Sequence, residues 1–282
     1  MGFFAEMKAL KAYRMHNKGE LTEARKLYEE ALNEGGLTQP RQILAYCVLL
    51  IRSGEYQKAK DLLVKFQKAP GMTPDQKTQL FMNYAACCYK LGDIDKGISI
   101  LERQHAKQTA GLVYETLGYL YVEKYAQGKE PDFDAIDAEN AAKAAQTAAE
   151  NAAAREANPE ALIVDPEPVL PAREAWQQGI EKGKAFVTEA IEYDDEDAIC
   201  LDNMGQFCYR VLGDKAGAEE WFRKAIAIKE GQIDTLWFLS RYDLEKGDKA
   251  AARAKLEKAL EGRFSPLNYA DREKIEAELK QL

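Results

Sequence analysis

The segment that comes nearest to a motif with known chemistry is Gly179-Ile-Glu-Lys-Gly183-Lys184-Ala185, which has the outline of a phosphate-binding loop. Such a loop has four residues between its glycines and a Ser or Thr after its lysine, whose hydroxyl binds magnesium. Here three residues separate the glycines, and Ala185 stands at the hydroxyl position. The segment therefore does not predict nucleotide binding.

Metal ligands and nucleophiles are scattered through the chain. His16 and His105 are the two histidines, and neither has a Cys or His at a metal-ligand spacing. The run Asp194–Asp197 lacks the alternating ligands and the glycine of a calcium loop. No Ser or Cys stands in a recognisable nucleophile motif. We therefore expect no metal, no cofactor and no catalytic residue, and we predict that the protein is not an enzyme.

The composition narrows the classes of partner and location. Hydrophobic residues make up 46% and charged residues 30%, as in a globular protein, and the net charge of −8 disfavours nucleic acid as a partner. Five cysteines without paired spacings indicate a reducing compartment. We find no secretory signal and no apolar run long enough to span a membrane, so the sequence predicts a cytoplasmic location.

A pattern of about 34 residues recurs along the chain and predicts the elements that would position a site. It consists of a glycine with an acidic residue, a small residue five positions after the glycine, a large apolar residue, and a further small residue. The fullest copies are Gly213-Asp214 with Ala218, Phe222 and Ala225, and Gly247-Asp248 with Ala252, Leu256 and Ala259; other copies begin at Gly19, Gly54 and Gly92.

Each part of this pattern has a physical role in a helical hairpin. The glycine ends one helix in a left-handed conformation, and the acidic residue starts the next helix near the positive end of its dipole. The small residue lets the two helices approach closely, and the large residue fills the space between hairpins. Upstream of the glycines, apolar residues recur at spacings of three and four, which indicates the first helix of each hairpin.

The pattern resembles the tetratricopeptide repeat family, whose repeats read W-x2-L-G-x2-Y and then A-x3-F with a further Ala. The best match to the first half is Tyr114, Leu117, Gly118 and Tyr121, with Tyr114 in place of the family's Trp. The resemblance covers residues 5–125 and 172–262. It implies an all-α fold, a right-handed superhelix (α-solenoid) of about six hairpins with a C-terminal capping helix and an insertion in the fourth repeat.

The resemblance divides the chain into four parts. Residues 3–125 are expected to hold repeats one to three and the first helix of repeat four. Residues 126–171 form an insertion rich in Ala and Pro. Residues 172–262 complete repeat four and supply repeats five and six, and residues 263–282 form the capping helix, with Pro266 in its first turn.

Three interpretations of the insertion stay open. The first is a solvent-exposed helix over 132–157 with a loose linker, because that stretch is rich in Ala but poor in large apolar residues. The second takes Leu162-Ile163-Val164, an extended apolar strip between prolines, as a gate that lies against the protein's own groove. The third is an arm that binds a partner.

The resemblance also implies where a partner binds. In the family, the first helices of the hairpins line the concave side and hold an extended peptide or a partner helix. Aromatic rings supply contact area at low entropic cost, and amides can pair with a peptide backbone. Projected onto this chain, the inward-facing positions that we expect to bind a partner are Tyr13, Asn83, Tyr89, Lys90, Tyr119, Glu123, Asn203, Gln206, Arg210, Trp237 and Arg241.

The leading hypothesis is a non-catalytic protein–protein interaction module that binds a peptide or partner segment in the concave groove. Ala9 and Tyr13 stand where some family members carry the Lys and Asn that clamp the carboxylate of chaperone tails, so that ligand is disfavoured and a neutral or mixed peptide is favoured. The alternatives are a peptide-sensing regulator, and an accessory subunit or self-associating scaffold of a larger complex. We expect neither nucleic acid nor a membrane span.

Overall fold

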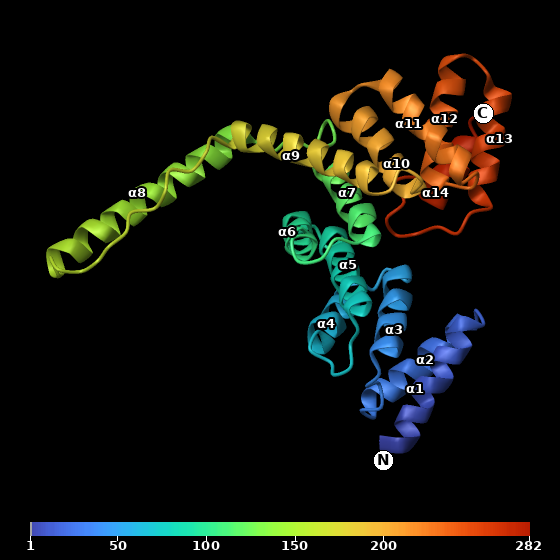
Figure 1. Ribbon diagram of the computed structural model, residues 1–282, viewed down its shortest axis with the longest axis horizontal. Helices are drawn as coiled ribbons and strands as arrows, with labels where there is room; N and C mark the ends of the chain where they lie inside the picture. Colours follow the sequence, from blue (N-terminus) through green and yellow to red (C-terminus); the bar gives the residue numbers. More distant parts are fainter. Residues whose placement is uncertain (1) are drawn as a thin grey trace.

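The fold is a series of helical hairpins stacked side by side (Figure 1). The computed structural model describes residues 2–282, and within them the hairpins follow one another in chain order. The pairs are α1 (Gly2–Asn17) with α2 (Leu21–Asn33), α3 (Pro40–Arg52) with α4 (Tyr56–Phe66), α5 (Pro74–Lys90) with α6 (Ile94–His105), α7 (Gly111–Tyr125) with α9 (Ala172–Tyr193), α10 (Ala198–Gln206) with α11 (Lys215–Ile228), and α12 (Ile233–Glu245) with α13 (Lys249–Leu260).

The residues of the recurring pattern start and end these helices as the sequence predicts. The anchor glycines all have positive φ, for example 71° at Gly213 and 79° at Gly247. The aspartates that follow cap the second helices of their hairpins. The side chains of Asp93, Asp214 and Asp248 each accept a hydrogen bond from the backbone N–H three residues later.

Small residues allow the helices to approach, and aromatic residues fill the space between hairpins. Gly205 of α10 faces Phe222 of α11 so closely that a Cβ added to it would lie 2.6 Å from the ring. The Phe222 ring in turn stacks on Phe238 of α12, with centroids 4.8 Å apart. Both rings are buried, so the fifth hairpin is joined to the sixth by an aromatic contact in the core.

The first helix of the fifth hairpin ends in a π-helix, η1 (Phe207–Leu212). The backbone N–H of Gln127, which follows α7, donates to the carbonyl of Arg210 at 2.8 Å. The end of the fourth hairpin's first helix is therefore tied to η1. Single π-turns are frequent at functional sites, and this one carries the Arg210 side chain.

The insertion forms an arm that projects from the stack (Figure 1). We call residues 126–171 the arm. Its helix α8 spans Phe133–Ala157, and none of that helix is buried. The helix begins where the sequence predicts, with the Asp132 side chain as its N-cap.

The linker after α8 lies along the helix instead of against the groove. The Asp165 carboxylate accepts hydrogen bonds from Arg155 at 2.8 Å and from Asn151 at 3.0 Å. Leu162, in the middle of the apolar strip, is 96% exposed. This placement corrects the gating interpretation, because Asp165 holds the strip to α8 and away from the hairpins.

The C-terminal helix is shorter than the sequence predicts. α14 spans Arg272–Leu279, whereas the sequence assigns residues 263–282 to the capping helix. The reason lies on α12, where the Asp234 carboxylate accepts hydrogen bonds from the backbone N–H groups of Tyr269 and Ala270. These contacts hold an irregular loop in front of α12, and the helix starts only after it.

Candidate functional site

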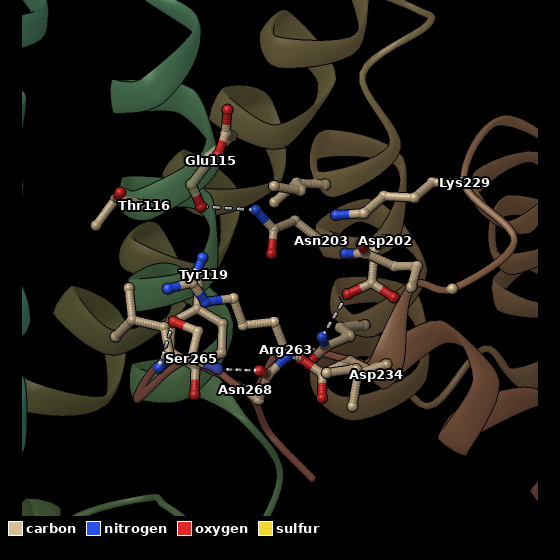
Figure 2. Close-up of a pocket in the computed structure, with 16 residues that line it drawn as sticks. Glu115, Thr116, Tyr119, Asp202, Asn203, Lys229, Asp234, Arg263, Ser265 and Asn268 are labelled. Carbon is tan, nitrogen blue, oxygen red and sulfur yellow. Dashed lines mark hydrogen bonds between the residues drawn. The ribbon is translucent and has the colours of Figure 1, made fainter. Parts of the chain in front are cut away.

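The first helices of the hairpins form one face of the solenoid, which we call the inner face, and its C-terminal half contains a cavity of about 290 Å³ (Figure 2). The walls come from α7, α10 and α12, and residues 263–268 of the loop before α14 close it. The polar side chains that line the cavity include Glu115, Thr116, Tyr119, Asp202, Asn203, Gln206, Lys229, Asp234, Arg263 and Asn268.

A hydrogen-bonded network runs across the inner face from α5 to α10. The Tyr89 hydroxyl donates to Glu123 Oε2 at 2.7 Å, and Arg210 Nη1 donates to Glu123 Oε1 at 2.6 Å. Arg210 also donates to Gln206 Oε1 at 3.0 Å, and Gln206 Nε2 donates to Asp202 Oδ2 at 2.7 Å. Each side chain of the Arg210–Glu123 pair is 9% exposed, so water and salt screen it little. The network links three consecutive hairpins.

Tyr119 of α7 contacts helix α5, and Asn203 of α10 contacts helix α7. The ring of Tyr119 meets the ring of Tyr89 edge-on, with centroids 5.9 Å apart. Asn203 Nδ2 donates to the backbone carbonyl of Glu115 at 2.8 Å, next to Gly118, where a Cβ would come within 3.1 Å of it. Burial raises the pKa of Tyr119, so its hydroxyl stays protonated.

Three carboxyl groups around the cavity are buried or half-buried, and burial raises their pKa values. Burial, followed by the charge of Asp234, raises the pKa of Asp202 well above its ordinary value. Burial, followed by the charge of Asp197, raises the pKa of Glu115 to about 7. Burial also raises the pKa of Asp234 against the opposing effect of its hydrogen bonds. The charge of this half of the inner face therefore varies near neutral pH.

The chain's own C-terminal segment occupies part of the inner face. Asp234 Oδ2 accepts hydrogen bonds from the Asn268 side-chain amide at 3.0 Å and from the Tyr269 backbone N–H at 3.1 Å. The Tyr269 ring stacks on Phe238 with centroids 5.3 Å apart, and the Arg210 guanidinium lies 3.9 Å from that ring's centroid. An irregular stretch of main chain is thus already bound here through its N–H groups and one aromatic ring.

The helix that follows this stretch covers the end of the inner face. The Glu278 carboxylate of α14 accepts hydrogen bonds from Trp237 Nε1 at 2.9 Å and from Arg241 Nη2 at 2.6 Å. Trp237 is 8% exposed as a result. The last hairpin therefore uses its inward-facing side chains to hold α14.

The N-terminal half of the inner face is less occupied. Tyr13 lines a cavity of about 270 Å³ together with Gln79 of α5. Asn83 and Lys90 follow Gln79 at helical spacings, on the same face of α5. Among residues 2–282, the buried Nδ2 atom of Asn83 has no hydrogen-bond partner. Burial lowers the pKa of Lys90, although the charges of Glu123 and Asp271 oppose the shift.

The part of the chain that the structure describes offers no cluster of three or more His, Cys, Asp or Glu side chains that could hold a metal ion. Over the same residues, no helix is both long and apolar enough to cross a bilayer. The five cysteines are buried and unbonded, and burial raises the pKa of the Cys47 thiol to about 12. What the inner face offers chemically is hydrogen bonding, aromatic contact and charge.

Comparison with known proteins identifies the fold. Neither the protein-family models nor the curated proteins give a match. Among solved structures, the chain is similar to a thermophilic TPR protein from Thermus thermophilus, with a TM-score of 0.57 and 17% identity over 86% of this chain and 98% of that one. The chain has the fold of the tetratricopeptide repeat (TPR) proteins.

A second similarity agrees with this fold. Human IFIT1, solved as a dimer with m7Gppp-AAAA, matches with a TM-score of 0.55 and 16% identity over 97% of this chain and 53% of that one. The predicted TPR α-solenoid is confirmed, and the hairpins are its repeats. The arm separates the two helices of the fourth repeat, since α7 packs against α9.

The TPR inner face holds the predicted binding residues in three different states. Those that join the buried network or line the cavity are Tyr89, Tyr119, Glu123, Asn203, Gln206 and Arg210. Those that hold α14 are Trp237 and Arg241. Tyr13, Asn83 and Lys90 belong to neither group and stay partly exposed. Internal hydrogen bonds thus engage most of the predicted binding residues in the C-terminal half of the inner face.

Asp202, Asp234 and Tyr269 are important to this face and were missed from the sequence. Asp202 and Asp234 are almost fully buried, at 2% and 4% exposure. A signal was present for Asp202, because it is the single acidic residue of the largely apolar helix α10. No local signal marks Tyr269, whose role depends on the loop returning to α12.

Proposed function

We propose that this TPR protein is a non-catalytic interaction module that holds an extended segment of a partner protein on its inner face. The observation that supports this proposal is the binding of the chain's own loop. Asp234 accepts hydrogen bonds from main-chain N–H groups of that loop, and the Tyr269 ring contacts Phe238 and Arg210. A surface that satisfies backbone donors and accommodates an aromatic side chain can bind another segment in the same way.

The N-terminal half of the inner face is where the partner segment would bind. Tyr13 supplies an aromatic ring and Lys90 a cation, while Val48 adds a partly exposed apolar side chain. The unpartnered Asn83 amide is a donor for a peptide carbonyl. Because a buried polar atom without a partner costs free energy, a ligand that accepts this hydrogen bond would recover it.

Selection of a displayed random peptide library on the full chain tests the proposal. Selected peptides should bind the unchanged protein. Tyr13→Ala with Asn83→Ala should weaken binding about ten-fold or more, because tyrosines often carry a large share of the binding energy and Asn83→Ala removes a hydrogen-bond donor. The matched control is Lys26→Ala with Lys249→Ala, which removes exposed cations from the second helices α2 and α13.

The control pair should leave peptide affinity unchanged. If the peptides bind the Tyr13 and Asn83 variant as well as the unchanged chain, the inner face is not the binding surface. Circular dichroism melts of all variants establish that each keeps its fold.

A further inference from the structure

Two buried amide side chains that line the cavity of about 290 Å³ keep polar atoms that the protein does not use. Asn203 is 3% exposed, and its Nδ2 donates to the Glu115 carbonyl, but among residues 2–282 its Oδ1 accepts no hydrogen bond. Gln232 is 8% exposed and stands at the N-cap of α12, yet its side chain makes no capping hydrogen bond and pairs with no other described residue. Because buried polar groups are normally paired, a polar ligand in this cavity would supply the missing partners.

Charges of both signs border the same cavity without pairing. Lys229, at the end of α11, and Arg263, in the loop before α14, supply cations, while Glu115 of α7 and Asp202 of α10 supply carboxyl groups. Across residues 2–282, none of these four side chains forms an ion pair, so the cations and carboxyl groups stay more than 4.0 Å apart. A ligand that carries both signs of charge could bridge them.

The cationic side of the cavity suits a carboxylate. Figure 2 shows the Lys229 side chain extending toward Asn203. The N-terminus of α12, which has no side-chain cap, adds the positive end of a helix dipole at Gln232. Lysine, arginine and the N–H groups of a helix N-terminus all donate to carboxylate oxygens.

The opposite side suits an ammonium group. Asn203 Oδ1 is a free acceptor, and the Glu115 and Asp202 carboxyl groups provide negative charge nearby. The hydrogen bonds that Asp202 accepts come from the uncharged side chains of Gln206 and Thr235, so no cation balances it directly. An ammonium group offers three donors and the missing charge.

The size of the cavity and its apolar residues limit the rest of the ligand. A volume of about 290 Å³ is near the lower end of the range of pockets that hold small molecules, about 300 to 1,000 Å³. Ile199, Ile233 and Leu267 line it between the polar groups. These side chains favour a small aliphatic group.

We propose that this cavity binds a free α-amino acid with an aliphatic side chain. Its carboxylate would lie toward Lys229 and Arg263, and its ammonium group toward Asn203 Oδ1. Its side chain would contact Ile199 and Leu267. The inference goes beyond the proposed function, because it concerns a small molecule and a cavity separate from the N-terminal half of the inner face.

Isothermal titration calorimetry of the full chain with L-leucine tests the proposal. Leucinamide lacks the carboxylate, as does the first residue of a peptide, and 4-methylpentanoate lacks the ammonium group. L-leucine should bind, and each analogue should bind about ten-fold or more weakly, because each leaves charged or polar groups of the cavity without a partner. Leucinamide that binds as tightly as L-leucine would overturn the proposal in favour of a peptide N-terminus, and 4-methylpentanoate that does so would overturn it in favour of a simple carboxylate.

Two variants locate the site. Gln232→Leu and, separately, Lys229→Gln with Arg263→Gln should each weaken L-leucine binding about ten-fold or more. Neither change removes a hydrogen bond or ion pair that these side chains make within the described chain, so both variants should fold, and thermal melts check that they do.

The matched control is Lys26→Gln with Lys249→Gln, which removes exposed cations far from the cavity and should leave L-leucine binding unchanged. The proposal is overturned if L-leucine, L-isoleucine and L-valine all fail to bind the unchanged chain at millimolar concentration. It is also overturned if folded Gln232→Leu protein binds L-leucine as tightly as the unchanged chain. Neither result affects the proposed function, which the peptide selection tests at Tyr13 and Asn83.

Discussion

Arg210 and Glu123, 87 residues apart in sequence, meet at 2.6 Å on the inner face. Arg210 stands on the π-helix of the fifth repeat and Glu123 on the first helix of the fourth. The Tyr89 hydroxyl reaches the second oxygen of the same carboxylate from the third repeat. One buried carboxylate therefore joins side chains from three repeats.

Removing this carboxylate's charge should destabilise the protein strongly. Glu123→Gln leaves the Arg210 guanidinium buried without a counter-charge, which typically costs about 3 kcal/mol in the free energy of unfolding. Urea denaturation monitored by circular dichroism measures the change. Glu245→Gln is the control, because its pair with Lys215 is solvent-exposed and should leave the denaturation midpoint unchanged. Equal midpoints for the two variants would contradict the role given to Glu123.

The raised pKa of Glu115 predicts a dependence of stability on pH. Its pKa is about 7 in the folded protein against an ordinary value of 4.5, so the folded state holds this proton more tightly between those limits. Stability from this group is present below pH 4.5 and is lost as pH rises through 7. Glu115→Gln removes the loss.

Between pH 5 and pH 8, the free energy of unfolding of Glu115→Gln should therefore rise relative to that of the unchanged chain, by roughly 1 kcal/mol after allowance for partial exposure. Chemical denaturation across this range measures the difference in the free energy of unfolding between the variant and the unchanged chain. Both proteins contain Asp202, so its contribution cancels in that difference. Glu150→Gln, on the exposed arm, should follow the unchanged chain throughout. A Glu115→Gln curve parallel to that of the unchanged chain would show that burial does not perturb this carboxyl.

Gly205 should tolerate no side chain. A Cβ would lie 2.6 Å from the Phe222 ring, so Gly205→Ala should destabilise by about 1–3 kcal/mol through overpacking. Gly111→Ala is the matched control, because nothing lies within 4 Å of a Cβ there. Thermal unfolding of the two variants compares their melting temperatures. A Gly205→Ala protein as stable as the control would mean that α10 and α11 are not packed this closely.

The loop before α14 should open when its main-chain acceptor is lost. Asp234→Ala removes the hydrogen bonds from Asn268, Tyr269 and Ala270, so amide hydrogen exchange in that loop should accelerate about ten-fold or more. Asp271→Ala, which removes only the N-cap of α14, is the comparison. Unchanged exchange at Tyr269 in the Asp234 variant would show that other contacts hold the loop.

The sequence predicted the repeats because each carries its own local signals. Gly213 and Gly247 end helices in the left-handed region, and Asp214 and Asp248 cap the helices that follow, as their positions in the pattern indicate. These interactions involve residues a few positions apart. The periodic first helices likewise depend only on local spacing.

What the sequence did not predict depends on contacts between distant segments. The start of α14 is set by Asp234, more than thirty residues earlier in the chain. Gln206 and Arg210 project inward as expected, but they are engaged because Asp202 and Glu123 lie within hydrogen-bonding distance. The position of a residue in the repeat pattern indicates which face of the solenoid its side chain lies on. Only the packed structure shows whether that side chain is hydrogen-bonded within the protein or available to a partner.

A hydrogen-exchange footprint of the full chain with a selected peptide tests the central claim most directly. The account predicts slower exchange in the first helices α1, α3 and α5, with the second helices α2, α4 and α6 unchanged. Slower exchange confined to α2, α4 and α6 would contradict it, because the partner would then bind the outer face of the solenoid.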